Sequence, residues 1–206
     1  MRRVLGRANS SNVMKVVWLL EELHLPYRRE DYGGPFKNTG TPEYLALNPN
    51  GIVPTLVEDD FVLWESNAIL RYLATANPAG DLWPADPRPR ANIDRWMDWQ
   101  QTTYTPPGSV VFQGLVRTPP EHRDEAAITA ATTKLGRVWT LLDTVLSRAA
   151  YVAGPIFTLA DIPLGVHVHR WFALPIDRPE LPHLRAWYDR LRQRPAYAAH
   201  CAGPVT

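Results

Sequence analysis

The chain changes its pattern near residues 78–89, and this change constrains the fold more than any other feature of the sequence. The stretch from Asn77 to Pro89 holds four prolines and a glycine, a composition typical of a connection rather than of a helix or a strand. Before it, short strand-like and helix-like segments alternate, whereas every periodic segment after it has helical spacing. We therefore expect an N-terminal domain over residues 1–77, a linker over 78–89 and an all-helical domain over 90–206.

The first part predicts an α/β domain. Its strand-like and helix-like segments follow one another as a strand at 2–6, a helix over 13–23, a strand at 27–32, a short helix at 42–47, strands at 53–57 and 61–64, and a helix over 66–75. The first two strands are joined through a helix, which favours parallel pairing, and the last two flank an acidic hairpin turn. The order β-α-β, then α, then β-β-α, predicts a thioredoxin-like domain with a mixed four-stranded sheet.

The second part predicts an all-α bundle, with helices near 88–104, 121–149, 159–172 and 181–193. The Tyr104-Thr105-Pro106-Pro107-Gly108 stretch is expected to interrupt the first of these helices, where the pocket should lie. Thr158 and Asp161 have the spacing of a capping box, in which the threonine hydroxyl accepts a main-chain N–H and the aspartate bonds back.

Composition excludes several classes of function. Lysine and arginine number 22 against 21 aspartates and glutamates, so no net charge favours a nucleic acid or an anionic membrane. No segment approaches the roughly 20 apolar residues of a membrane span. The single cysteine, Cys201, allows neither an internal disulfide nor a cysteine metal cluster, and His167 and His169 point in different directions on a helix. We therefore expect a cytoplasmic protein without a metal.

The segment between the first strand and the first helix reads Asn9-Ser10-Ser11-Asn12. Such side chains commonly cap a helix by accepting its free N–H groups. A hydroxyl at this place also lies where the helix end favours an anion, and a thiolate there would be stabilised by both. Because the segment holds no sulfur, dithiol redox chemistry is excluded.

Two more segments of the first part have features of a binding site. Pro54 follows a β-branched residue directly before a strand, so Val53-Pro54 is a candidate cis bond that would leave the main chain of Val53 free for an extended peptide. Ser66 heads a helix and offers its hydroxyl to a carboxylate, while Glu65 beside it suits an amino group. Together these two residues fit the α-amino acid end of a ligand.

These three segments, in this order and followed by the proline-rich linker and the Thr158–Asp161 pair, resemble the glutathione transferase superfamily, closest to its serine-type bacterial and plant (phi-like) members. The resemblance covers essentially the whole chain. It implies glutathione as co-substrate, with Glu65 and Ser66 at the γ-glutamyl end and Val53 with Pro54 at the cysteinyl backbone. The catalytic group at the first helix is Ser10, Ser11 or Asn12. Ser10 fits a Ser-x-Asn-Val pattern, counting back from Lys15 selects Ser11, and some bacterial relatives use an asparagine here.

The resemblance also implies contacts beyond these segments. Lys37 lies in the loop where relatives supply a basic contact to the glycyl carboxylate, whereas Ile52 stands where relatives carry glutamine, lysine or arginine. The helical domain would supply an apolar pocket for the second substrate, with candidates Tyr104, Trp96, Phe112 and Trp171.

The resulting hypothesis is a glutathione S-transferase that ionises glutathione and transfers its thiolate to hydrophobic electrophiles in detoxification. Reduction of hydroperoxides is expected as a second reaction. A homodimer is implied, with Trp64 and Arg71 near the contact. The alternatives are a glutathione-dependent isomerase or dehalogenase, and a non-catalytic relative that serves binding or dimerisation. No nucleic acid or membrane partner is expected.

Overall fold

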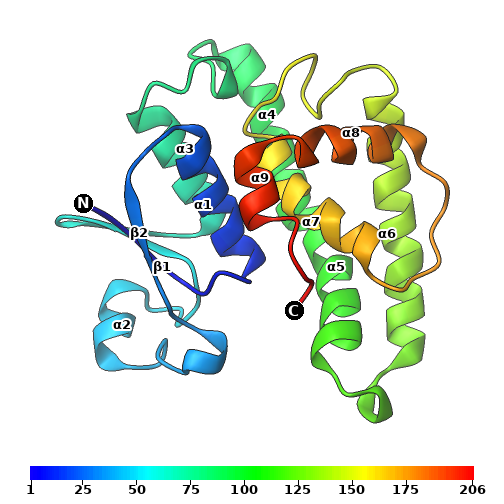
Figure 1. Ribbon diagram of the computed structural model, residues 1–206, viewed down its shortest axis with the longest axis horizontal. Coiled ribbons are helices and arrows are strands. Elements are labelled where there is room, and N and C mark those ends of the chain that lie inside the picture. Colours follow the sequence, from blue (N-terminus) through cyan, green and yellow to red (C-terminus); the bar gives the residue numbers. More distant parts are fainter.

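The alternation of short strands and helices in the first part builds one sheet, which Figure 1 shows beside the helices of the second part. The computed structural model describes residues 1–206. The elements of the first part are β1 (Arg2–Leu5), α1 (Ser11–Glu22), β2 (Tyr27–Glu30), α2 (Pro42–Leu47), β3 (Thr55–Glu58), β4 (Phe61–Trp64) and α3 (Ser66–Ala76). The strands lie in the order β2-β1-β3-β4, with β1 parallel to β2 and the other two pairs antiparallel. The predicted thioredoxin-like fold with a mixed four-stranded sheet is confirmed.

Side chains of the central strands alternate between two faces, and different helices cover each face. Val4 and Leu56, which are partners in the β1–β3 register, belong to the large buried cluster that includes α1 and α3. Leu5 and Val57 pack on the other face with Tyr44 of α2. The sheet is therefore covered on both faces, and the segments that join strands to helices lie at the ends of the strands.

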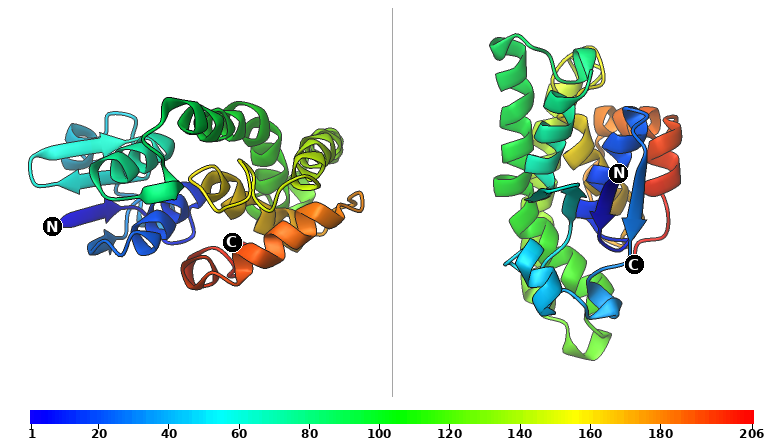
Figure 2. Two further views of the ribbon diagram at one scale, coloured as in Figure 1. Left: turned by 90° about the horizontal axis from the view of Figure 1, so that it is seen from above. Right: turned by 90° about the vertical axis from the view of Figure 1, so that its left-hand side faces the viewer.

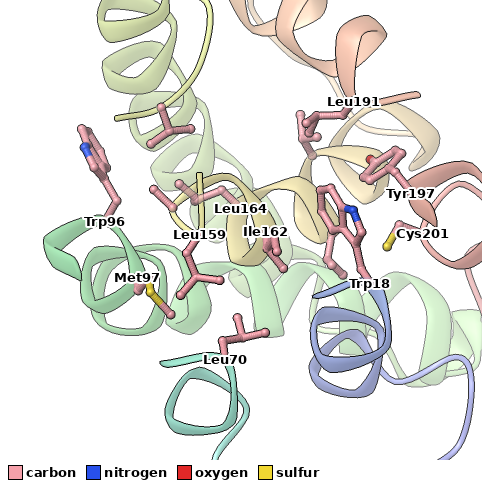
Figure 3. Packing of buried hydrophobic residues seen from close by; sticks show 14 of the residues in the cluster. Trp18, Leu70, Trp96, Met97, Leu159, Ile162, Leu164, Leu191, Tyr197 and Cys201 are labelled. Atoms are coloured by element: carbon pink, nitrogen blue, oxygen red, sulfur yellow. The ribbon is translucent and has the colours of Figure 1, made fainter. Parts of the chain in front are cut away.

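One continuous core joins the two parts of the chain. Trp18 of α1 is fully buried, and Figure 3 shows its ring next to that of Tyr197. The centres of the two rings lie 4.8 Å apart in an edge-to-face arrangement. A side chain at Gly165 would come within 2.8 Å of the Trp18 ring, so a glycine is needed for α7 to pack this closely on α1. Because α1 lies between the sheet and the helical part, its N-terminus is held at a fixed place between them.

The helical part consists of α4 (Pro87–Trp99), α5 (Thr105–Phe112), α6 (Glu125–Leu146), α7 (Asp161–Ala173), α8 (Pro182–Arg192) and α9 (Pro195–His200). The predicted all-α second domain is confirmed. None of the helices combines the length and the apolar sequence that crossing a membrane requires.

The prediction that the stretch from Tyr104 to Gly108 interrupts the first helix of this part is wrong. Figure 2 shows α4 and α5 as one continuous column. A wide π-helical turn over Gln100–Tyr104 joins them. Proline removes an N–H donor and its ring clashes with the carbonyl four residues earlier, and one extra residue in the preceding turn moves those carbonyls away. The Gln100 carbonyl accepts instead from the Thr105 hydroxyl at 3.1 Å.

The capping box at the start of α7 forms only in part. Asp161 Oδ2 accepts from the Thr158 N–H at 2.9 Å, as predicted, but the Thr158 hydroxyl donates to the same oxygen at 3.2 Å instead of accepting an N–H. Asp161 is fully buried, and a buried carboxylate needs hydrogen-bond donors for its oxygen atoms. The Thr158 hydroxyl therefore serves as a donor here.

Candidate functional site

The N-terminus of α1 presents unpaired polar groups. The first intrahelical bond runs from the Met14 N–H to the Ser10 carbonyl, so the N–H groups of the first turn have no main-chain acceptor. Ser10 occupies the N-cap position with an extended backbone, but its side chain makes no capping hydrogen bond. The capping role that its sequence position suggests is therefore not used. A buried hydroxyl and a helix end both remain available to a ligand.

Asn12, the second residue of the same helix, connects this end to a second helix N-terminus. Its Oδ1 accepts from the Ser66 hydroxyl at 3.3 Å, and Ser66 is the first residue of α3. Two helix N-termini, each with a partial positive charge, thus lie next to one another. The arrangement suits a ligand that carries more than one negative group.

Glu65 precedes α3 with a backbone φ of 71°. A residue other than glycine pays roughly 1–3 kcal/mol for such a conformation, which persists only where the surrounding structure enforces it. The Glu65 carbonyl accepts the first hydrogen bond of α3, from Ile69 at 2.9 Å, while the side chain stays exposed. The carboxylate is thus held beside the helix end without a partner of its own.

The loop before β3 supplies the opposite wall. The predicted cis bond between Val53 and Pro54 is present. The β1–β3 ladder ends at the Leu5–Thr55 pair, and none of the main-chain hydrogen bonds outside the helices and strands involves Val53. Its N–H and C=O are therefore free to bond an extended peptide.

A polar network fixes this loop from behind. The Ile52 carbonyl accepts from the Tyr44 hydroxyl at 2.7 Å and from Asn48 Nδ2 at 2.8 Å. The Ile52 side chain itself is 55% exposed. As predicted for an aliphatic side chain, it offers a ligand no hydrogen bond.

These elements surround a cavity of about 380 Å³. It lies between the sheet part and the helical part, and its lining residues are Arg7, Asn9, Ser10, Ser11, Asn12, Gly33, Gly34, Thr39, Gly51, Ile52, Val53, Gln101, Tyr104, Thr105, Gly108, Ser109, Phe112, Gln113, Arg117, His167 and Arg170. Small-molecule sites commonly measure 300–1,000 Å³, so this one stands near the lower limit.

The structure brings together some of the predicted site residues and not others. Ser10, Ser11, Asn12 and Val53 line the cavity from the sheet part, and Tyr104 and Phe112 line it from the helical part. The other residues predicted to bind glutathione lie outside its lining: Ser66 adjoins it through the contact to Asn12, Glu65 precedes Ser66 and is exposed, Pro54 is buried behind Val53, and Lys37 is exposed in its loop.

Two of the tryptophans predicted for the pocket belong to the core instead. Trp96 is 8% exposed and packs edge-on against Trp99, and Trp171 is 2% exposed and packs near Trp139. The expectation of an apolar pocket also needs correction. Only four lining residues are hydrophobic, namely Ile52, Val53, Tyr104 and Phe112. Large aromatic side chains stabilise the helical bundle more when fully buried than when they line a wet cavity.

Sequence reasoning missed the basic residues of this cavity. Arg7 comes from the loop after β1, Arg117 from the turn that follows α5, and Arg170 from α7. His167 lies one turn before Arg170 on α7, and its ring packs 4.5 Å from Tyr104. The i, i+3 spacing of His167 and Arg170 places both on one face of a helix, which was the signal available in the sequence.

Behind the cavity lies the fully buried Lys15, which forms no ion pair but has its charge favoured by the Glu65 carboxylate. Lys15 Nζ donates to Gln100 Oε1 at 2.9 Å, which links α1 to the π-helical turn. Burial lowers the pKa of Lys15 to about 7. Burial, with the cations Lys15 and Arg170 nearby, also holds the pKa of His167 well below its usual range, so this imidazole is neutral.

The depressed pKa of Lys15 predicts a pH dependence of stability. The unfolded chain keeps the Lys15 proton up to about pH 10, whereas the folded chain releases it near pH 7, so raising the pH through this window favours folding. The free energy of unfolding of the wild type, relative to Lys15→Met, is expected to rise by up to about 1.4 kcal/mol per pH unit between pH 7 and pH 9. Urea unfolding of both proteins at these two pH values measures the difference. If the free energies of unfolding of the two proteins change in parallel between pH 7 and pH 9, the prediction is wrong.

Comparison with known proteins identifies the family. Sequence models of the glutathione S-transferase N-terminal domain and C-terminal domain match residues 9–76 and 95–195. Glutathione S-transferase GstB of Escherichia coli strain K12 is 42% identical over 203 residues, which are 98% of this chain and 98% of that relative. The chain belongs to the glutathione S-transferase family.

Other glutathione S-transferases agree with this assignment. Glutathione S-transferase 3 of Zea mays is 34% identical and covers 95% of this chain and 90% of its own. The crystal structure of the theta class glutathione S-transferase from Xanthomonas axonopodis pv. citri, with glutathione bound, superimposes with a TM-score of 0.96 at 48% identity, over 100% of this chain and 99% of that one. The function predicted from the three N-terminal segments is confirmed: the chain is a glutathione S-transferase.

Proposed function

We propose that the protein binds glutathione along the sheet edge of the cavity, with the cysteinyl sulfur at the N-terminus of α1, and transfers that sulfur to an electrophile held against the helical part. The observation that carries this proposal is the Ser10 hydroxyl, which is buried, lines the cavity and makes no hydrogen bond within the protein. The free N–H groups of the first turn of α1 lie beside it. Both features favour a thiolate over a thiol at this place.

Groups already described would bind the rest of the tripeptide. The Glu65 carboxylate and the Ser66 end of α3 suit the amino and carboxylate groups of the γ-glutamyl residue. The free main chain of Val53, ahead of Pro54, suits the cysteinyl backbone as a one-residue strand addition. Lys37 follows the Gly33-Gly34 wall and stays a proposed contact to the glycyl carboxylate.

The proposed mechanism needs no covalent intermediate on the protein. The thiol proton leaves as glutathione binds, because a hydrogen bond from Ser10 and the end of α1 stabilise the negative sulfur. Holding the sulfur and the electrophile in one small cavity then supplies proximity, and the fixed donors require no reorganisation during attack. Ser11, the first residue of α1, and Asn12 remain alternatives for the hydrogen bond.

We also propose a homodimer in the cytoplasm. Strand β4 is an edge of the sheet, and Phe61 and Trp64 on it are each 40% exposed, which is the kind of surface that a second subunit covers. Arg71, predicted near the same contact, is held by Asp94 and Asp98 of its own chain. The single cysteine favours a reducing compartment. Sedimentation of the wild type and of Trp64→Glu tests the dimer.

The variant Glu65→Gln tests the proposed binding of glutathione, because it keeps the size of the side chain and removes its charge. Loss of one charge-assisted hydrogen bond is expected to weaken glutathione binding by about 10- to 30-fold. Isothermal titration calorimetry with glutathione measures it, and Glu43→Gln, at an exposed glutamate in α2 away from the cavity, is the matched control. Wild-type protein that neither binds glutathione nor conjugates it to a chloronitrobenzene would overturn the proposed function.

A further inference from the structure

The helical side of the cavity carries more positive charge than an apolar electrophile requires. Arg117 and Arg170 line it from this side, and Arg7 lines it from the loop after β1. No aspartate or glutamate is among the lining residues, although the chain as a whole has 22 basic and 21 acidic residues. The excess of positive charge is therefore a local property of this cavity.

None of these guanidinium groups has an aspartate or glutamate partner. None of the three forms an ion pair with an aspartate or glutamate side chain, and the side chains of Arg7 and Arg170 donate no hydrogen bond within the protein. Arg170 lies 3.9 Å from the centre of the Phe112 ring, and Arg117 lies 5.5 Å from the same centre. Phe112 thus holds two cations over one apolar surface.

Arg117 has one bond, from Nη2 to the main-chain oxygen of Thr206 at 2.9 Å. This contact brings the last residues of the chain to the rim of the cavity, and Asn9 Nδ2 contacts the Thr206 hydroxyl at 2.9 Å from the other side. The bond leaves most of the five guanidinium donors of Arg117 free.

Placing three cations around one cavity is unfavourable unless an anion offsets them. The pKa values of the arginines reflect this cost. Burial and, to a smaller extent, the charge of Arg117 lower the pKa of Arg7. Burial, together with the charges of Arg117 and Arg7, lowers the pKa of Arg170 to about 10. Glutathione brings two carboxylates, and the proposed partners of both lie on the sheet side. Arg117 and Arg170 lie across the cavity with Tyr104 and Phe112.

We propose that the second substrate is a small electrophile that itself carries a carboxylate, held by Arg117 and Arg170 with Arg7 while the glutathione sulfur attacks it. This inference rests on the proposed function and narrows its substrate class from hydrophobic electrophiles to anionic ones. The cavity volume of about 380 Å³ supports a small substrate, because part of that space belongs to glutathione.

A matched pair of probes tests the inference: 4-chloro-3-nitrobenzoate, which is an anion, and 4-chloro-3-nitrobenzamide, which is neutral and of nearly the same shape. In both, the thiolate sulfur adds to the ring carbon that bears chlorine, a C–S bond forms, and chloride leaves with the electron pair of the broken C–Cl bond. The kcat/KM of each is divided by its uncatalysed rate constant with glutathione at the same pH, because the carboxylate activates the ring less than the amide does.

The wild type is expected to prefer the benzoate after this normalisation. Arg117→Gln and Arg7→Gln are each expected to lower kcat/KM for the benzoate by about 10- to 100-fold and for the amide by less than about threefold, as loss of a charge-assisted contact would. Arg137→Gln, at an exposed arginine of α6 without a partner, is the matched control and should leave both rates unchanged. Added NaCl should slow only the benzoate reaction.

The outcomes separate the inference from the function on which it rests. Conjugation of the amide without preference for the benzoate, or a preference that the arginine variants leave intact, overturns the inference alone. Arginine variants that weaken glutathione binding in calorimetry without changing the benzoate-to-amide ratio also overturn it, since the cations would then serve glutathione. A protein that binds no glutathione and conjugates neither probe overturns both.

Discussion

Ser10→Ala is expected to lower kcat/KM for conjugation by about 10- to 100-fold, which corresponds to the loss of one hydrogen bond to a charged sulfur. The Ser10 hydroxyl has no partner in the protein, so its removal breaks no internal contact. The loss therefore reports on the ligand rather than on the fold. The pKa of bound glutathione is expected to rise by up to about 2 units, which shifts the pH–rate profile upward and reduces the thiolate ultraviolet absorbance at neutral pH.

The same measurements on neighbouring positions assign the hydrogen bond. Ser11→Ala removes a second unpaired hydroxyl of the same cavity and is expected to change kcat/KM by less than about threefold. Asn12→Ala breaks the 3.3 Å contact to Ser66 and should weaken glutathione binding more than it changes the pKa of the thiol. If Ser11→Ala shows the large loss, the role moves to Ser11, and if all three variants keep full activity, the thiolate assignment is wrong.

Local signals in the sequence predicted the sheet part well. Prolines, which have few conformational choices, mark where several of its helices begin or end, such as Pro26 after α1 and Pro42 at the start of α2. The helix over 42–47 is reproduced at both ends. The cis bond at Pro54 was only a candidate from its neighbours, because an ordinary trans proline also fits the start of a strand.

The helical part was less predictable, because its decisive features depend on contacts between distant segments. Pro106 and Pro107 indicated a break, but the widened turn before them keeps the helix continuous. Trp96 and Trp171 were assigned to a pocket because aromatic residues serve a core and a ligand site equally well in sequence. Only the packing of α4 and α7 against their neighbours separates the two uses.

The basic character of the cavity was hidden for a related reason. Arg7, Arg117 and Arg170 are more than 50 residues apart from one another and belong to three different segments. With a nearly neutral chain, no run of charge marks them. They become a cluster only once α1 fixes the sheet part against α7, through Trp18 and Gly165.

The largest effect on stability is predicted at Asp161, the first residue of α7. Its carboxylate accepts from the N–H groups of Val152 at 3.0 Å and Thr158 at 2.9 Å, from the Thr158 hydroxyl at 3.2 Å and from Trp187 Nε1 at 2.9 Å. These donors come from the loop between α6 and α7 and from α8, so the side chain of Asp161, at the start of α7, connects three segments.

Asp161→Ala is expected to lower the free energy of unfolding by about 3–5 kcal/mol, because several buried donors lose their acceptor at once. For a chain of this size the midpoint of thermal unfolding should fall by roughly 10 °C or more. Asp161→Asn keeps the shape and one acceptor oxygen, and should therefore lose less than the alanine variant. Asp177→Ala, at an exposed aspartate without a hydrogen-bond partner, is the control. An Asp161→Ala protein that melts with this control would show that the buried donors find other partners, and that the start of α7 does not depend on the carboxylate.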